Sequence, residues 1–135
     1  MGSIPQLAAK SDSRNGVASI ALRGELEMAS VPDLEGHLAP FESNGVSAIM
    51  LDLRELTFID STGLRALLEA RNRAESKGQR LIMVGTRPSA RRLFELTGTE
   101  FLLGDEDVIG VLRQFTGIRT SGTEETLKPR IDVDA

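Results

Sequence analysis

Short apolar runs of strand length alternate along the chain with stretches in which apolar residues recur at helical spacing. The runs that predict strands occupy residues 17–22, 49–53 and 80–85, with two weaker runs at residues 4–9 and 101–103. The stretches that predict helices begin near Ser30, Ser61, Pro88 and Asp105. This alternation predicts an α/β sandwich with a mixed sheet of four to five strands and about four helices, its central strands parallel and its first pair antiparallel.

The stretch from residue 48 to residue 78 organises the rest of the chain. A buried strand is predicted over residues 49–53, followed by a short connector that contains Phe58 and Ile59. The polar cluster of residues 60–63 comes next, and Gly78 stands where the C-terminal cap of the following helix is expected. Ser61 is therefore expected where a strand has ended and a helix begins.

A polar cluster at the start of a helix can serve three roles. About four backbone N–H groups lack a partner in the first helical turn, and a Ser or Asp side chain can satisfy one of them. The same free donors and the helix dipole favour an anion. The Ser61 hydroxyl can therefore cap the helix, act as a nucleophile or accept a phosphate. Capping is the commonest role, but three consecutive polar residues exceed what a cap requires.

Further local signals set the limits of the other elements. Residues 11–16 form a turn cluster, residues 24–27 are expected to be a loop, and His37 is expected on a solvated helix face. Residues 1–16 are predicted as an N-terminal segment that could add an edge strand, residues 17–115 as the domain, and residues 116–135 as a mobile tail. Ser30 is a candidate N-cap with Pro32 in the first helical turn, and Pro88 is expected to open a helix that stops at Gly98. Asp105 is expected to cap the last helix.

Composition narrows the class of protein. The 135 residues suit one domain, and the net charge of -4 argues against a nucleic-acid partner. The absence of Cys excludes disulfides and thiolate chemistry. Apolar runs fall far short of the ~20 residues of a membrane span, and no leader is recognisable, so a cytoplasmic protein is expected.

The sequence gives little support for an enzyme active site or a metal site. A hydrolase nucleophile elbow needs Gly two residues before the Ser, where this chain has Ile59, and the single His, His37, precedes Ser61. No phosphate-binding Gly-rich loop is present, so no cofactor is expected, and no catalytic residue is assigned. Nothing in the spacing of the carboxylates singles out a metal site; the acidic residues near strand ends are Glu25, Glu27, Asp52, Asp60 and Asp105.

Three segments together resemble the STAS domain (sulphate transporter and anti-sigma-factor antagonist). They are residues 24–27, residues 51–64 and residues 88–98, and the similarity runs from about residue 17 to residue 115. More narrowly, the segments resemble those of the stand-alone bacterial anti-sigma-factor antagonists. The family often has Asp where this chain has Glu27, which keeps the charge and adds one methylene.

The resemblance implies a switched binding protein and no enzyme. Such proteins bind an anti-sigma factor that is also a serine kinase, which frees the sigma factor for RNA polymerase. The kinase phosphorylates the residue that corresponds to Ser61, with Thr62 as the rival acceptor, and a serine phosphatase resets it. The residues expected to contact the partner are Glu25, Glu27, Asp60, Ser61, Thr62, Gly63, Leu64, Pro88 and Arg92. The alternative is a non-phosphorylated STAS subunit of a transporter or a multi-protein signalling complex.

Overall fold

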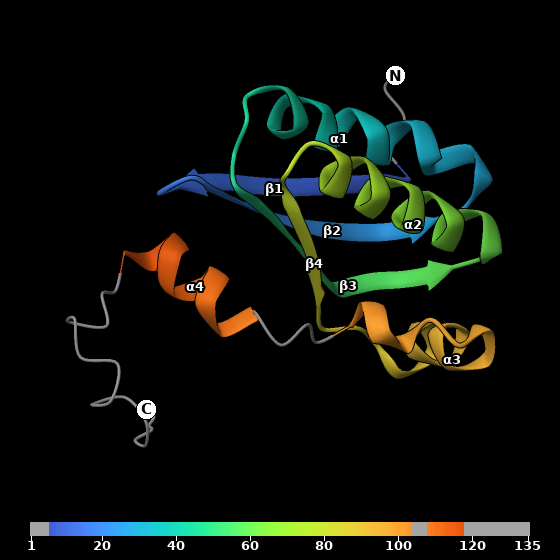
Figure 1. Ribbon diagram of the computed structural model, residues 1–135. Coiled ribbons are helices and arrows are strands. Elements are labelled where there is room, and N and C mark those ends of the chain that lie inside the picture. Colours follow the sequence, from blue (N-terminus) through green and yellow to red (C-terminus); the bar gives the residue numbers. More distant parts are fainter. Residues whose placement is uncertain (1–5, 104–107, 118–135) are drawn as a thin grey trace, which may run out of the picture.

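The computed structural model describes residues 6–103 and 108–117. Its described elements are the strands β1 (Leu7–Arg14), β2 (Val17–Leu26), β3 (Ala48–Ile59) and β4 (Arg80–Val84), the α-helices α1 (Val31–Ser43), α2 (Ser61–Ser76), α3 (Pro88–Thr97) and α4 (Val108–Thr116), and the 3₁₀ helices η1 (Met28–Ser30) and η2 (Glu100–Leu102). They form one sheet in the order β1-β2-β3-β4 with helices on both faces (Figure 1). The predicted α/β sandwich is confirmed.

A tight hairpin joins β1 to β2. Asn15 and Gly16 have φ values of 52° and 78°, the conformation that a two-residue hairpin turn requires and that Asn-Gly adopts readily. Their neighbours Arg14 and Val17 pair across the turn, and the antiparallel ladder continues to Leu7. The turn is therefore confined to two residues, and the prediction of a turn cluster over residues 11–14 was wrong.

The two inner strands are longer than the apolar runs that predicted them. β2 pairs in parallel with β3 up to the register pair of Leu26 and Ile59, with irregularities near Ala21 and Gly24. The predicted loop at residues 24–26 and the predicted connector at Phe58 are therefore strand. These irregularities break the strict alternation of inward and outward side chains, which is the signal that sequence reading relies on.

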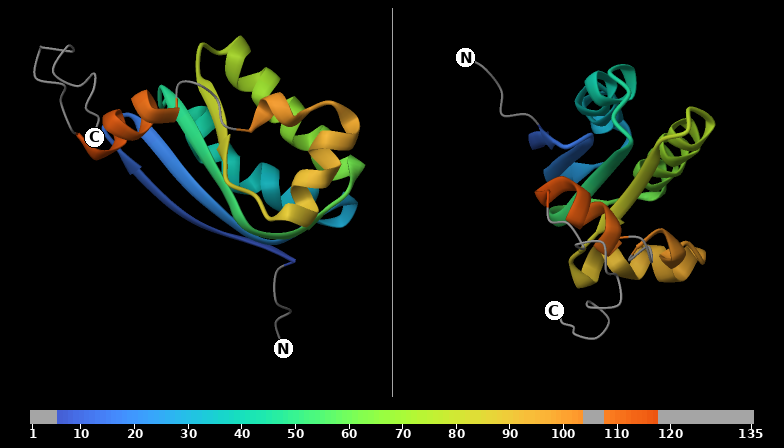
Figure 2. Two further views of the ribbon diagram at one scale, coloured as in Figure 1. Left: turned by 90° about the horizontal axis from the view of Figure 1, so that it is seen from below. Right: turned by 60° about the vertical axis from the view of Figure 1, so that its left-hand side comes forward.

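Helices α1 and α2 cover one face of the sheet, and α4 lies on the other face beside the β1–β2 hairpin (Figure 2). The main core lies under α1 and α2, and Phe94 of α3 is fully buried in it. A smaller cluster joins α4 to the sheet through Val17, Met50, Ile82 and Val111. Helices therefore pack on both faces of the sheet. This packing supports the strand ends that precede the polar cluster.

Of three other local predictions, one is confirmed and two were wrong. Helix α3 ends at Gly98, which has φ 71°, as predicted. The apolar run at residues 101–103 forms no strand: it belongs largely to η2, and only Leu103 bridges to Met83 of β4. His37 is half-buried rather than solvated, because its Nε2 lies 3.1 Å from the carbonyl oxygen of Leu7.

The predicted domain limits stay predictions. Asp105 as the cap of the last helix lies outside the described residues, as does the predicted tail from residue 118 onward. Among the helices that the structure describes, none combines the length and the apolar character that crossing a bilayer requires.

Candidate functional site

The predicted polar cluster lies where β2 and β3 end and α2 begins. Glu25 pairs with Phe58 and Leu26 with Ile59 at the last rungs of the parallel ladder. One residue later the Asp60 backbone N–H donates to the carbonyl oxygen of Leu26 at 3.3 Å. These contacts fix the position from which α2 starts.

Asp60 is the N-cap of α2. Its backbone is extended, with φ −111° and ψ −176°, and its carboxylate accepts the Gly63 backbone N–H at 2.8 Å. The Asp60 carbonyl accepts the Leu64 N–H at 2.9 Å, the first bond of the helix ladder. Asp60 therefore supplies the side-chain cap of α2, and Ser61 is the first residue inside the helix.

Gly63 lets α2 approach β2 closely. A Cβ atom at this position would lie 2.5 Å from the carbonyl oxygen of Leu26 and 2.8 Å from its Cγ. Atoms cannot approach so closely, so only Gly fits without a shift of the helix. The adjoining Leu64 is 4% exposed and belongs to the core. Gly63 and Leu64 therefore fix the start of α2 against β2 and the core.

Ser61 and Thr62 are exposed, and neither side chain has a hydrogen-bond partner among the residues that the structure describes. Because Asp60 performs the capping, these two hydroxyls have no structural task at the helix start. Both stand at the end of a helix where the dipole favours negative charge. The hydroxyls are accessible to another macromolecule.

Glu27 has a structural task that the sequence did not reveal. Its carboxylate caps η1 by accepting the Ala29 N–H at 2.8 Å, and it also accepts the side-chain amide of Gln6. The Glu27 backbone N–H donates to the Ser30 hydroxyl at 3.0 Å, and that hydroxyl donates to the Glu25 carbonyl at 2.7 Å. Ser30 is the N-cap residue of α1, as predicted, but its buried side chain makes no capping bond to that helix and serves this turn instead.

Three other residues predicted to contact the partner lie outside the polar cluster: Glu25, Pro88 and Arg92. Glu25 is exposed, and its carboxylate lies 3.4 Å from the Gln6 amide nitrogen. Pro88 is the first residue of α3, and Arg92 is exposed on that helix, which packs against β3. Over residues 6–103 and 108–117, no hydrogen bond or ion pair joins either α3 residue to the polar cluster.

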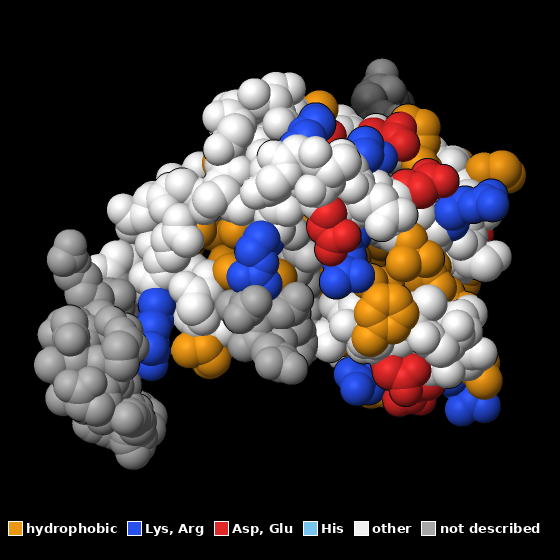
Figure 3. All heavy atoms as spheres, viewed as in Figure 1, with side chains coloured by type: hydrophobic (Ala, Val, Ile, Leu, Met, Phe, Trp, Pro, Cys, Tyr) orange, Lys and Arg blue, Asp and Glu red, His pale blue; other side chains and the backbone are white. Residues whose placement is uncertain are grey.

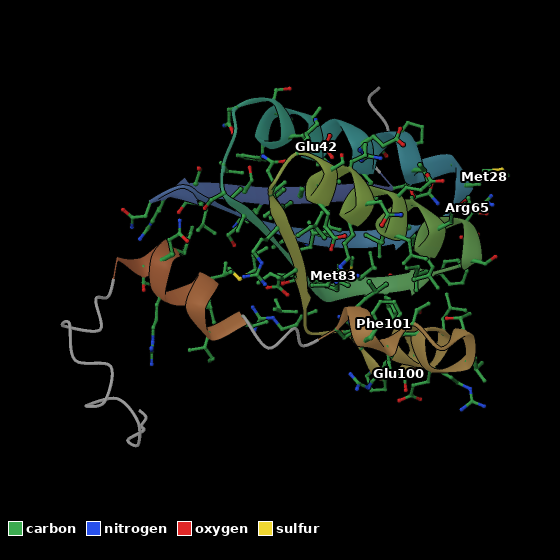
Figure 4. All side chains as sticks on the ribbon, viewed as in Figure 1. Met28, Glu42, Arg65, Met83, Glu100 and Phe101 are labelled. Atoms are coloured by element: carbon green, nitrogen blue, oxygen red, sulfur yellow. The ribbon has the colours of Figure 1, made fainter. Side chains whose placement is uncertain are left out.

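Two exposed apolar side chains near the cluster were not predicted as site residues. Met28 of η1 is 71% exposed and Phe58 of β3 is 49% exposed. Figure 4 shows Met28 at the end of the molecule where α2 begins, and η1 contacts α2. Figure 3 shows hydrophobic, acidic and basic side chains exposed together over this end. A large apolar residue at the close of a strand, next to charged residues, is the signal that could have identified Phe58.

Neither a group of metal ligands nor the surface hollow described next adds to this cluster in the part of the chain that the structure describes. No group of three or more His, Cys, Asp or Glu residues there could hold a metal ion. A shallow hollow of about 310 Å³ lies over β1 and β2, beside Lys10, Arg23 and Glu55, and includes none of the cluster residues.

Comparisons with known proteins agree with this architecture. An anti-sigma-B factor antagonist of Staphylococcus aureus (strain NCTC 8325 / PS 47) is 31% identical over 84 residues, which cover 62% of this chain and 78% of that protein. The solved structure of the anti-sigma factor antagonist SpoIIAA in its unphosphorylated form has a TM-score of 0.66 at 22% identity and covers 83% of this chain and 99% of that chain. An anti-sigma factor antagonist from Mycobacterium paratuberculosis also has a TM-score of 0.66, at 23% identity, and covers 86% of this chain and 99% of that chain.

The two solved structures share the fold with this chain. The family model described as the STAS domain matches residues 8–112, from the first strand into the last described helix. The chain therefore belongs to the STAS domain family.

Proposed function

We propose that this chain is an anti-sigma-factor antagonist. It binds a serine-kinase anti-sigma factor in the cytoplasm, which releases the sigma factor. Phosphorylation of Ser61 abolishes this binding, and a serine phosphatase restores it. The chain itself acts as a binding protein, because the kinase and phosphatase activities belong to its partners.

One observation carries the proposal: the hydroxyl of Ser61 is exposed and without a hydrogen-bond partner among the described residues, while Asp60 caps the helix. A hydroxyl with a structural role would be costly to modify, but this one can be esterified without loss of a contact. The relatives support the same role, since the Staphylococcus aureus protein and SpoIIAA are both named as antagonists of anti-sigma factors.

The physics of a phosphate at this position suits a switch. Phosphorylation adds about -1.5 to -2 charges. In the free protein, the helix N-terminus favours that charge by only ~0.3–1 kcal/mol, so the fold is kept. In a docked complex the same charge stands beside Asp60 and must be desolvated or opposed, and like-charge contacts there cost several kcal/mol. The penalty in the complex exceeds the local benefit, and binding is lost without refolding.

The surface around Ser61 indicates the charge and apolar character of the partner's surface. Glu25, Asp60 and the half-buried Glu27 make its rim acidic, while Met28 and Phe58 expose apolar area. A partner with basic residues opposite Glu25 and Glu27 and an apolar centre over Met28, Phe58 and the Ser61 hydroxyl complements such a surface. A phosphate at Ser61 would then meet the apolar centre, where no cation of the partner opposes its charge. Pro88 and Arg92 of α3 extend the proposed contact along the edge of β3.

The proposal is tested by incubating the protein with ATP and each candidate anti-sigma kinase from the same genome. Mass spectrometry of the phosphopeptides then separates Ser61 from Thr62. The variant Ser61→Ala is expected to lose the modification, whereas the matched variant Thr62→Ala is expected to keep it. A phosphate that persists in Ser61→Ala would contradict the assignment.

The alternative, a STAS subunit of a transporter or signalling complex, makes a different prediction. Affinity capture with the full chain would then recover a permease or a large sensor assembly in place of a small kinase. Ser61 would also remain unmodified in the cell.

A further inference from the structure

Arg65 lies one helical turn after Ser61 on α2, and both side chains are exposed. Residues four positions apart on a helix are neighbours, with Cβ atoms about 5–6 Å apart. Figure 4 shows Arg65 near the start of α2, directed away from the sheet. A group attached to the Ser61 hydroxyl is thus within reach of the guanidinium.

Arg65 differs from the other arginines of α2 in having no partner. Arg71 pairs with Glu75 at 3.6 Å and lies over the ring of Phe101, and Arg73 pairs with Glu42 at 3.0 Å. Within the described ranges, Arg65 forms no ion pair or hydrogen bond, although Glu69 stands four residues after it. Its charge is therefore free to interact with a group added nearby.

The charges around Ser61 make such a cation useful. Asp60 precedes the hydroxyl, and Glu27 caps the turn that contacts α2. A phosphate at Ser61 would add charge of the same sign to this surface. An acidic group that precedes a basic one by four residues is the favoured order on a helix, and a guanidinium binds phosphate oxygens through paired hydrogen bonds.

We propose that Arg65 is the intramolecular counter-ion of phosphorylated Ser61. In the free phosphorylated protein the guanidinium holds the phosphate against α2 and lowers the pKa of its second ionisation. The phosphate then keeps its double charge to a lower pH and is held at one position on the surface of α2. This inference rests on the proposed function, because it requires Ser61 to be the phosphate acceptor.

The test needs neither kinase nor partner. Phosphoserine is incorporated at position 61 during translation, and the phosphate is titrated by phosphorus NMR in the full chain and in the variant Arg65→Gln. The midpoint is expected to rise by a few tenths of a pH unit in Arg65→Gln, and the difference is expected to shrink in about 1 M salt.

Lys77→Gln is the matched control, since it loses the same single charge at the far end of α2. At 1.5 Å per residue the two ends lie about 24 Å apart, well beyond the ~8 Å Debye length at physiological salt. Equal midpoints in the parent protein and Arg65→Gln at low salt would overturn the inference, as would an equal rise in Lys77→Gln. Neither result bears on whether a kinase modifies Ser61, so this test fails separately from the proposed function.

Discussion

The carboxylate of Asp60 accepts the backbone N–H of Gly63 at 2.8 Å, and this bond assigns the capping of α2 to Asp60 rather than to Ser61. Asp60 closes the helix start, and the neighbouring Ser61 is left exposed. The stability of α2 and the proposed modification of Ser61 can therefore be tested by separate substitutions.

Asp60→Ala is expected to destabilise the fold by about 1 kcal/mol, because the first turn of α2 loses its side-chain acceptor. For a domain of this size the melting temperature should fall by about 3–5 °C. Asp60→Asn keeps an acceptor oxygen and should melt close to the parent protein. Thermal unfolding by circular dichroism measures both, and equal melting of Asp60→Ala and the parent would contradict the capping role.

Gly63→Ala is expected to cost about 1–3 kcal/mol, because its Cβ would lie 2.5 Å from the Leu26 carbonyl oxygen. Gly36→Ala on α1 is the matched control, since the Cβ it adds has no atom within 4 Å apart from its chain neighbours and the backbone of its own helix. That variant should stabilise the protein by about 0.5–1 kcal/mol, as Ala suits a helix interior better than Gly. Denaturant unfolding measures both changes, and a neutral Gly63→Ala would contradict the close approach of α2 to β2.

Asp52 is expected to make stability depend on pH in the acid range. The Arg54 side chain donates to its carboxylate, with Nε at 2.9 Å from Oδ1, and this bond holds the pKa of Asp52 below its ordinary value of 3.8. A depressed folded-state pKa adds stability that is present above the unfolded pKa. That stability is lost as the pH falls below about 4 and through the folded value.

Acid unfolding curves of two variants check this dependence. Asp52→Asn and Arg54→Gln should both flatten the decline of unfolding free energy below pH ~4, the first by removing the carboxylate and the second by removing its hydrogen-bond donor. Unchanged slopes in both variants would show that the pair has no role in acid stability.

Phe58→Ala is expected to weaken binding of the anti-sigma partner about tenfold or more, because an aromatic side chain at the centre of an interface commonly contributes over 1 kcal/mol. Ile109→Ala on α4 is the control: Ile109 is 59% exposed, against 49% for Phe58, but lies on another surface. Calorimetric titration should show a loss only for Phe58→Ala. Equal affinity in the two variants would remove Phe58 from the proposed interface.

The architecture and the position of Ser61 followed from the sequence because periodicity and helix signals agree there. Gly98 ends α3 where it was expected, and the helix that contains Ser61 begins at that residue. The choice between Asp60 and Ser61 as cap did not follow, since both residue types cap helices well. The extended backbone of Asp60, which makes it the cap, is set by its bond to Leu26 in a neighbouring strand.

Contacts between segments distant in the chain account for the other differences between the predictions and the structure. His37 lies on the outward side of a helical pattern, yet its ring nitrogen meets the Leu7 carbonyl of the hairpin. The ends of β2 and β3 alternate poorly because of register irregularities, so Phe58 was read as part of a connector. The sequence indicated only that Glu27 carries a charge. Its hydrogen bonds to Ala29 and Gln6 depend on the fold.

The most direct measurement compares the affinity of the unmodified and the Ser61-phosphorylated protein for the same anti-sigma factor, by calorimetry, with melting temperatures recorded in parallel. Phosphorylation is expected to lower the affinity a hundredfold or more, equivalent to several kcal/mol, while the melting temperature barely moves. The variant Ser61→Asp should behave similarly, and Ser61→Ala should bind like the unmodified protein. Equal affinity of the two forms, or a loss of affinity that comes with unfolding, would contradict the proposed phosphorylation switch.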